Sequence, residues 1–246
     1  MALYPLPTNL KLIFFFDCVS ATLWFCCLVR LLILLPLVGR RFLPGGIADF
    51  FHVVALLPLF GFFVVNSLGN RKLFLKDAWS LANGIRMAWI CYGVIFAHPK
   101  IAKHTSYSIL ILSYCLSNFI HFSYLAFRTK TRSSPWLLFW LQYTHHYITF
   151  PLTMGAEMVL IFLSLAFVAE DSIYEVALKA VLLAYVPIGY LAFNYLGKRR
   201  KERYTQVMKK RIQARNSAAN STVPTAAVST SGVAGVTESH ELRELN

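Results

Sequence analysis

Long apolar stretches, separated by short polar links, follow one another along most of the chain. A membrane span needs about 20 mostly apolar residues, and backbone groups inside lipid must be hydrogen-bonded within their own segment, which favours helices. The pattern therefore predicts an all-α, polytopic membrane protein, a bundle of six transmembrane helices. The expected spans cover residues 10–38, 47–67, 78–97, 106–127, 148–168 and 173–196, and residues 136–147 form a lead-in to the fifth.

The ends of these segments follow from breaks in the pattern. Residues 136–168 are apolar with one polar interruption, a length too long for one crossing and too short for two crossings joined by a loop. We therefore expect a lead-in that ends near Tyr147. Residues 1–200 form the transmembrane domain. Residues 198–246 are first basic, and beyond Asn216 they are rich in Ala, Ser, Thr and Val without an apolar period, which predicts a disordered cytosolic tail.

Composition agrees with a membrane protein, because 57% of the 246 residues are hydrophobic and only 14% are charged. The formal net charge of +13 is concentrated after the last span, beginning with Lys198-Arg199-Arg200-Lys201. A basic run at this place indicates the cytosolic side and anionic lipid rather than nucleic acid, for which no recognition module is present. With six spans, both termini are expected in the cytosol. The five cysteines lie in apolar stretches without paired spacing, which indicates buried thiols rather than disulfides or a zinc site.

One carboxylate, Glu157, is followed by an uncharged apolar run and therefore lies inside the predicted fifth span. An ionised side chain in hydrocarbon costs roughly 2.5 to 3.5 kcal/mol on insertion scales, so such a residue is a functional candidate. The alternative is that Glu157 only accepts hydrogen bonds from Tyr, Thr or His on a neighbouring helix. Asp17 and Arg86 are further charges within predicted spans.

Several nearby residues bear on what Glu157 can do. Gly155 leaves room for a chain or ligand to approach, and Pro151 removes one backbone hydrogen bond and is expected to bend the helix. The adjacent His145 and His146 point about 100° apart on a helix, which argues against a shared metal. In the fourth predicted span, polar side chains recur at helical spacing on one face and either join helices or line a cavity. They are Tyr114, Ser117, Asn118, His121 and Tyr124.

A sequence frame around Glu157 carries a family resemblance. The family's pattern is an aromatic lead-in, then Tyr-Pro and Gly, and a Glu seven residues after the Tyr of that Tyr-Pro pair. In this chain, Gln142-Tyr143-Thr144, with Tyr147, Pro151 and Glu157, fits the pattern. By this frame the chain resembles the very-long-chain (3R)-3-hydroxyacyl-CoA dehydratases, the protein-tyrosine-phosphatase-like membrane family of the endoplasmic reticulum. The resemblance covers residues 5–205. It implies a lyase that converts the (3R)-3-hydroxyacyl-CoA to the trans-2-enoyl-CoA in the fatty-acid elongation cycle.

The resemblance also implies that a Tyr and a Glu of the fifth span carry the reaction. Glu157 matches the Glu, whereas Phe150 stands at the family's Tyr position and has no hydroxyl to transfer a proton. Since a positioned acid or base contributes about 10²- to 10⁴-fold, either a weak enzyme or a substitute residue is expected. Tyr147 is the nearest phenol, although on a straight helix it lies about 15 Å along the axis from Glu157. Thr153 could position a water, and His146 is in phase with Glu157 but farther away.

Our leading hypothesis from the sequence is a dehydratase with Glu157 as its acid/base group. Basic residues ahead of the fifth span are candidates for binding the CoA phosphates, although marking membrane topology explains them more simply. They are Arg128, Lys130 and Arg132. No metal or organic cofactor is implied, and the expected partners are acyl-CoA, the lipid bilayer and enzymes of the elongation cycle.

Two alternatives stay open. The first is a catalytically impaired relative that binds or scaffolds the elongation machinery. The second is an unrelated transporter in which Glu157, Arg86 and Asp17 act as coupling charges, although the chain has no internal repeat of the kind that many transporters show.

Overall fold

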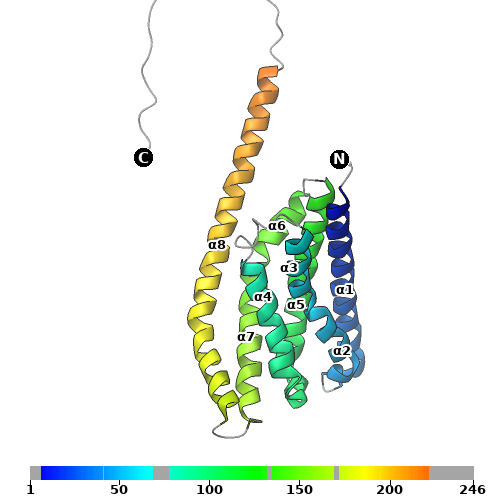
Figure 1. Ribbon diagram of the computed structural model, residues 1–246, viewed down its shortest axis with the longest axis vertical. Helices are drawn as coiled ribbons and strands as arrows, with labels where there is room; N and C mark the ends of the chain where they lie inside the picture. The colour runs from blue at the N-terminus through cyan, green and yellow to red at the C-terminus, as the bar shows by residue number, and fades with distance from the viewer. Residues whose placement is uncertain (1–6, 41, 69–77, 132–134, 169–171, 222–246) are drawn as a thin grey trace, which may run out of the picture. The chain divides into compact units, whose positions relative to one another are not determined.

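The computed structural model describes residues 7–40, 42–68, 78–131, 135–168 and 172–221, and nearly all of them are helical. No strand occurs within these ranges, which confirms the all-α class. The elements in chain order are α1 (Thr8–Val38), α2 (Leu43–Ala55), α3 (Leu57–Leu68), α4 (Ala78–Ala88), the π-helix η2 (Trp89–Ile95), the 3-10 helix η3 (Pro99–Lys103), α5 (Thr105–Thr131), α6 (Trp136–Thr144), α7 (His146–Leu165) and α8 (Ile173–Ser221) (Figure 1).

Within the described residues, five helical stretches are long and apolar enough to cross a membrane, and the chain is accordingly a multi-pass membrane protein. They are Thr8–Val38, Leu43–Leu68, Thr105–Thr131, Trp136–Leu165 and Ile173–Lys209. The third predicted span, residues 78–97, is built differently, because α4 continues into η2 and no single α-helix of spanning length forms there. Turns of π-helix are rare and frequently occur at functional sites.

Two spans are interrupted where the sequence weakens the helix. α2 ends at Ala55 and α3 begins at Leu57, directly before Pro58. A proline restricts the backbone of the residue before it and has no N–H to donate, which explains the break. α6 ends at Thr144 and α7 begins at His146, so the lead-in is a short helix that ends slightly before the position expected from the sequence.

α8 continues well beyond residue 196, where the sixth span was expected to end. No Pro or Gly occurs between Gly197 and the end of the helix at Ser221, and the Lys, Arg, Glu, Gln and Met residues there are strong helix formers. Residues 217–221, which composition assigned to a disordered tail, are therefore helical. The remaining tail, residues 222–246, lies outside the described part of the chain.

α5 is the central helix of the bundle. It packs along α1 and along α7, while α1 also contacts α2, and α3 packs on α4 (Figure 1). Trp24 of α1, Phe51 of α2 and Tyr107 of α5 are fully buried at the centre of the apolar core. The ring of Phe51 makes edge-to-face contacts with Trp24 at 6.5 Å and with Tyr107 at 6.1 Å between centroids. The bundle belongs to a compact unit Met1–Arg200, and Lys201–Asn246 forms a second unit.

Gly84 of α4 lies directly against the backbone of α3. A Cβ at this position would stand 3.0 Å from both Cα and N of Leu59. We expect Gly84→Ala to lower the free energy of unfolding by about 1–3 kcal/mol, the usual cost of overpacking, because backbone atoms cannot rotate away.

Gly155→Ala is the matched control for this prediction. Nothing lies within 4 Å of a Cβ at Gly155, and Ala favours a helix over Gly by about 1 kcal/mol. Thermal unfolding of both variants in detergent micelles compares them. Equal or higher stability of Gly84→Ala would contradict the close approach of α3 and α4.

Candidate functional site

Glu157 on α7 is fully buried and accepts hydrogen bonds from phenols on two other helices. The hydroxyl of Tyr114 on α5 donates to Oε1, and the hydroxyl of Tyr185 on α8 donates to Oε2 over 2.9 Å. Nη1 of Arg86 on α4 lies 3.3 Å from the same Oε2. Side chains of four helices thus meet at one carboxylate, and we call these four residues the Glu157 cluster.

Arg86 is held by contacts of its own. Nη2 donates to Oδ1 of Asn83 one turn earlier in α4 over 2.9 Å, and Nη1 lies 3.1 Å from Sδ of Met154. The ring of Phe150 stands 5.9 Å from the guanidinium carbon, a cation–π distance. The side chain of Arg86 is 23% exposed and that of Glu157 is 0% exposed, so the carboxylate is covered by the residues bonded to it.

Helical periodicity explains why Glu157 points inward. The buried positions of α7 recur every three or four residues, which places them on one face of the helix. They include Thr149, Thr153, Glu157, Leu160, Ile161 and Ser164. This helix packs along α5, whose buried residues include Tyr114 and Asn118. The Asn118 amide donates to the backbone oxygen of Tyr114 over 2.9 Å.

The chemistry of the cluster is that of a compensated buried charge. A carboxylate is tolerated in a low-dielectric interior only when an opposite charge and hydrogen-bond donors surround it. Both oxygens of Glu157 accept a phenol O–H, and hydrogen bonds to an ionised acceptor are roughly twice as strong as neutral ones. Direct contact between a phenol and a carboxylate also suits proton transfer. The same donors, however, occupy the positions that a substrate would have to reach.

The sequence profile of the protein tyrosine phosphatase-like protein family, PTPLA, matches residues 79–206. The matched region is slightly more than half of the chain and contains all four residues of the Glu157 cluster. The chain belongs to this family. The resemblance inferred from the sequence is thereby confirmed at the level of the family. No solved structure matches the chain.

Relatives within the family differ in how much of the chain they match. The β-1,6-glucan synthesis-associated protein KEG1 of Saccharomyces cerevisiae is 31% identical over 202 residues, which cover 76% of this chain and 94% of that protein. The very-long-chain (3R)-3-hydroxyacyl-CoA dehydratase PASTICCINO 2 of Arabidopsis thaliana is 23% identical over 133 residues, 52% of this chain and 60% of that protein. Dehydratase 2 of Homo sapiens is 20% identical over 128 residues, 46% of this chain and 50% of that protein.

Phe150, which the sequence resemblance places at the family's Tyr position, lies beside Arg86 and completes an aromatic wall. Its ring centroid is 6.5 Å from that of Trp79 in α4 and 6.3 Å from that of Phe193 in α8. The guanidinium of Arg86 lies within cation–π distance of this ring and within contact of Glu157. Phe150 is therefore adjacent to the cluster and supplies an apolar face to it.

Tyr147, the substitute suggested by the sequence, is partly exposed near the start of α7. Its ring stacks on His146 with centroids 4.4 Å apart and lies 5.0 Å from the guanidinium carbon of Arg200. His146 is buried, and its ring contacts Tyr147 and Phe193. The phenols bonded to Glu157 come from other helices, so the catalytic role of Tyr147 stays a prediction. Among the described residues, no group of three His, Cys, Asp or Glu side chains is placed to hold a metal ion.

Thr153 and Gly155 both precede Glu157 in α7, but one is buried and the other is exposed. The buried Thr153 hydroxyl donates to the backbone oxygen of Thr149 over 2.7 Å, a bond within α7. Gly155 is exposed, with open space where a Cβ would stand. Side chains two positions apart in a helix point in directions that differ by about 200°. The open space at Gly155 therefore lies on the face of α7 opposite to Glu157. The substrate contacts predicted for both residues remain predictions.

The basic residues considered for CoA binding lie toward the C-terminal end of α5. Arg128 is exposed there, and at 1.5 Å per residue it stands about 21 Å along the helix from Tyr114. Nζ of Lys130 lies 5.7 Å from the ring centroid of Phe14 in α1. Arg132 is outside the described residues. A role in phosphate binding stays a prediction for all three.

The polar face of α5 joins helices, one of the two roles that the sequence left open. His121 Nδ1 lies 3.1 Å from Gln142 Nε2, and Ser117 Oγ lies 3.2 Å from His145 Nε2, which links α5 to the junction of α6 and α7. Tyr114 extends the same face to the carboxylate. Three of the five polar side chains of this face, Tyr114, Ser117 and His121, thus bond to other elements, while the Asn118 amide donates within α5.

Tyr185 is the member of the cluster that sequence reasoning missed. A signal was present, because Leu178, Tyr185 and Ala192 are buried residues of α8 spaced seven apart, which places them on one face. Arg86 was identified as a charge within a span but without a partner. Spacing within one helix says which residues share a face and not which helix that face will meet.

Proposed function

We propose that this family member carries out no dehydration of its own and serves β-1,6-glucan synthesis as a membrane-embedded binding or scaffolding protein. The observation that carries this proposal is the closed carboxylate. Glu157 is fully buried, is paired with Arg86, and accepts the hydroxyls of Tyr114 and Tyr185. Phe150, at the family's Tyr position, cannot transfer a proton. In this account the Glu157 cluster holds α4, α5, α7 and α8 together.

The pattern of similarity supports this choice over catalysis. Similarity to the β-1,6-glucan synthesis-associated protein of Saccharomyces cerevisiae extends over 94% of that protein. The chain spans only 60% and 50% of the two dehydratases. The partners in this proposal are other membrane proteins required for β-1,6-glucan synthesis.

We further propose that the protein lies in the endoplasmic reticulum membrane with both termini in the cytosol. Basic residues occupy the last turn of α5 at Arg128 and Lys130 and follow the apolar part of α8 at Lys198 and Arg199. Such residues favour the cytosolic side of a membrane. The choice of compartment rests on the resemblance to the dehydratase family, which implies this membrane.

The test of this function is complementation in cells. Saccharomyces cerevisiae depleted of its β-1,6-glucan synthesis-associated relative is made to express this chain, and the β-1,6-glucan of the wall is measured. We expect both the wild type and Tyr114→Phe to restore the polymer, because Tyr114→Phe removes one hydroxyl and keeps the ion pair. Failure of a wild-type chain that is shown to be folded and inserted would contradict the proposal.

A second candidate function is favoured by one observation, the hydrogen bond from the Tyr114 hydroxyl to Glu157. A dehydratase must remove a proton from C2 of the 3-hydroxyacyl-CoA and protonate the hydroxide that leaves C3 as water. Tyr114 and Glu157 together could exchange these protons, with Tyr114 replacing the hydroxyl that Phe150 lacks. In that case Tyr114→Phe lowers the rate by about 10²- to 10⁴-fold.

A further inference from the structure

α8 is attached to the bundle in a different way from the other helices. The extensive backbone packing among the described elements lies within α1 to α7 and the two short helices η2 and η3, and α8 takes no part in it. The apolar window of α8 is 17% buried, the same share as for α1, compared with 56% for α5. Side chains hold it instead: Leu178 and Tyr185 belong to the apolar core, and the rings of Phe193 and Tyr195 contact Phe150 and Trp79.

Two phenol hydroxyls of α8 donate hydrogen bonds to other helices. Tyr174, in the first turn of α8, donates to the backbone oxygen of Gly93 in η2. Tyr185 donates to Glu157. The two tyrosines are eleven residues apart, about 16 Å along the helix. They hold α8 at separate points, and only one of the two touches the Glu157 cluster.

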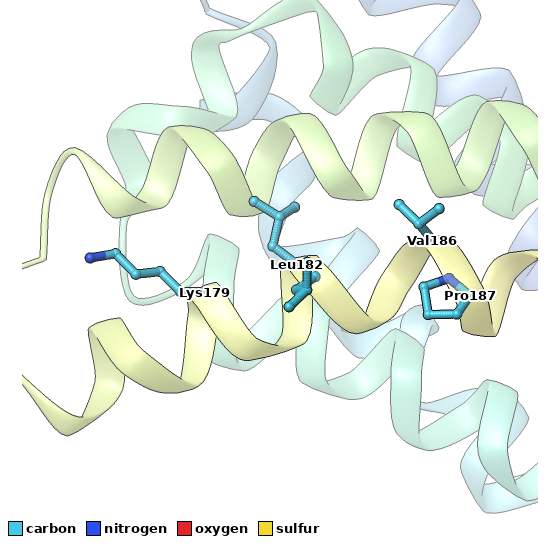
Figure 2. Close-up of a pocket in the computed structure, with 5 residues that line it drawn as sticks. Lys179, Leu182, Val186 and Pro187 are labelled. Atoms are coloured by element: carbon cyan, nitrogen blue, oxygen red, sulfur yellow. The ribbon is translucent and has the colours of Figure 1, made fainter.

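The surface of α8 beside α7 is hollowed. An apolar groove of about 660 Å³ is lined by Lys179, Leu182, Leu183, Val186 and Pro187. Figure 2 shows Leu182 and Val186 directed from α8 toward α7. Farther along, a Cβ at Gly189 would lie 2.9 Å from Cε of Met154, which marks a close approach of the two helices. The groove is thus lined by α8 alone, and near Gly189 the end of the Met154 side chain of α7 reaches the backbone of α8.

From these contacts we infer that α8 is a lateral gate, latched by Tyr174 and Tyr185, whose opening uncovers the Glu157 cluster to the bilayer. Helices in lipid are held together by van der Waals packing and hydrogen bonds, so separation of α8 costs the two hydrogen bonds together with the packing of its buried side chains. After opening, Glu157 keeps Arg86 and Tyr114, and the buried charge stays compensated. The inference concerns access to the cluster and holds whichever proposed function is correct.

The gate is tested by the reactivity of Glu157 toward a membrane-soluble carboxyl reagent. The purified full-length protein in lipid nanodiscs is treated with dicyclohexylcarbodiimide at fixed pH, and the labelled fraction of Glu157 is followed by peptide mass spectrometry. Tyr174→Phe is the decisive variant, because Tyr174 has no contact with the carboxylate and can change its labelling only through α8. Tyr190→Phe is the matched control, since Tyr190 is a 69% exposed residue of the same helix.

We expect Tyr174→Phe to label Glu157 about fivefold faster than the wild type, the equilibrium effect of one lost hydrogen bond, and Tyr190→Phe to match the wild type. Joining Met154→Cys to Gly189→Cys with a short bifunctional thiol reagent should suppress labelling in every background. Unfolding temperatures of the same samples separate gate opening from a general loss of stability. Equal labelling in Tyr174→Phe and wild type, or undiminished labelling in the joined protein, would overturn the inference.

Discussion

Glu157→Ala is expected to lower the free energy of unfolding by about 3–5 kcal/mol, the usual result of removing one partner from a buried ion pair. The substitution leaves the guanidinium of Arg86 without its counter-charge and leaves the hydroxyls of Tyr114 and Tyr185 without their acceptor. Both losses fall inside a bundle that the bilayer surrounds, where water cannot replace them. Unfolding in nanodiscs or mild detergent measures the effect.

The second described ion pair supplies the control. Glu175 lies 2.6 Å from Lys179 one turn later in α8, and the Lys179 side chain is exposed. A pair with a solvent-exposed partner at this spacing stabilises by less than about 1 kcal/mol, so Lys179→Ala should change stability little. Equal destabilisation by the two substitutions would show that the Glu157 cluster has no special part in holding the bundle.

The second large effect concerns catalysis. We expect purified protein to convert a very-long-chain (3R)-3-hydroxyacyl-CoA to the enoyl product at least about 10²-fold more slowly than dehydratase 2 of Homo sapiens assayed under the same conditions. The physical reason is that Phe150 has no proton to give and that both oxygens of Glu157 are already bonded. Product formation is followed by chromatography of the acyl-CoA.

A comparable rate for the two proteins would contradict this expectation and favour the second candidate function. In that event Tyr114→Phe and Tyr147→Phe identify the phenol that replaces the missing hydroxyl. Loss of product with Tyr114→Phe alone would assign the role to the residue bonded to Glu157. Tyr190→Phe, on the exposed face of α8, controls for the loss of any tyrosine hydroxyl.

The transmembrane character of the chain could be predicted from the sequence because it depends on local composition. Apolar stretches of sufficient length mark the spans. The break between α2 and α3 lies directly before Pro58, a residue that interrupts helices in general. The π-helical turn after α4 could not be predicted in this way. Its residues, Trp89–Ile95, read as an ordinary apolar stretch, and its hydrogen-bond pattern depends on the helices around it.

The site was predictable in part for the same reason. A lone carboxylate in an apolar span identifies Glu157 without any knowledge of its neighbours. Its partners depend on how faces of different helices meet, and so Arg86 was found without its role, Tyr114 was found as one of five polar residues, and Tyr185 was missed. A search for a substitute phenol among residues near Glu157 in sequence led to Tyr147. The ring of Tyr147 contacts His146 at the start of α7 and Arg200 of α8.

An apolar replacement of the whole cluster tests most directly whether Glu157 holds helices together or performs chemistry. The variant combines Glu157→Leu, Arg86→Met, Tyr114→Phe and Tyr185→Phe, which removes both charges and every hydroxyl that would be left without a partner. Replacing a buried ion pair by hydrophobic residues of similar volume is often neutral or stabilising. The account predicts that this variant folds and restores β-1,6-glucan in depleted cells to the wild-type level. A variant that is folded and inserted yet restores none would show that the cluster has a chemical role.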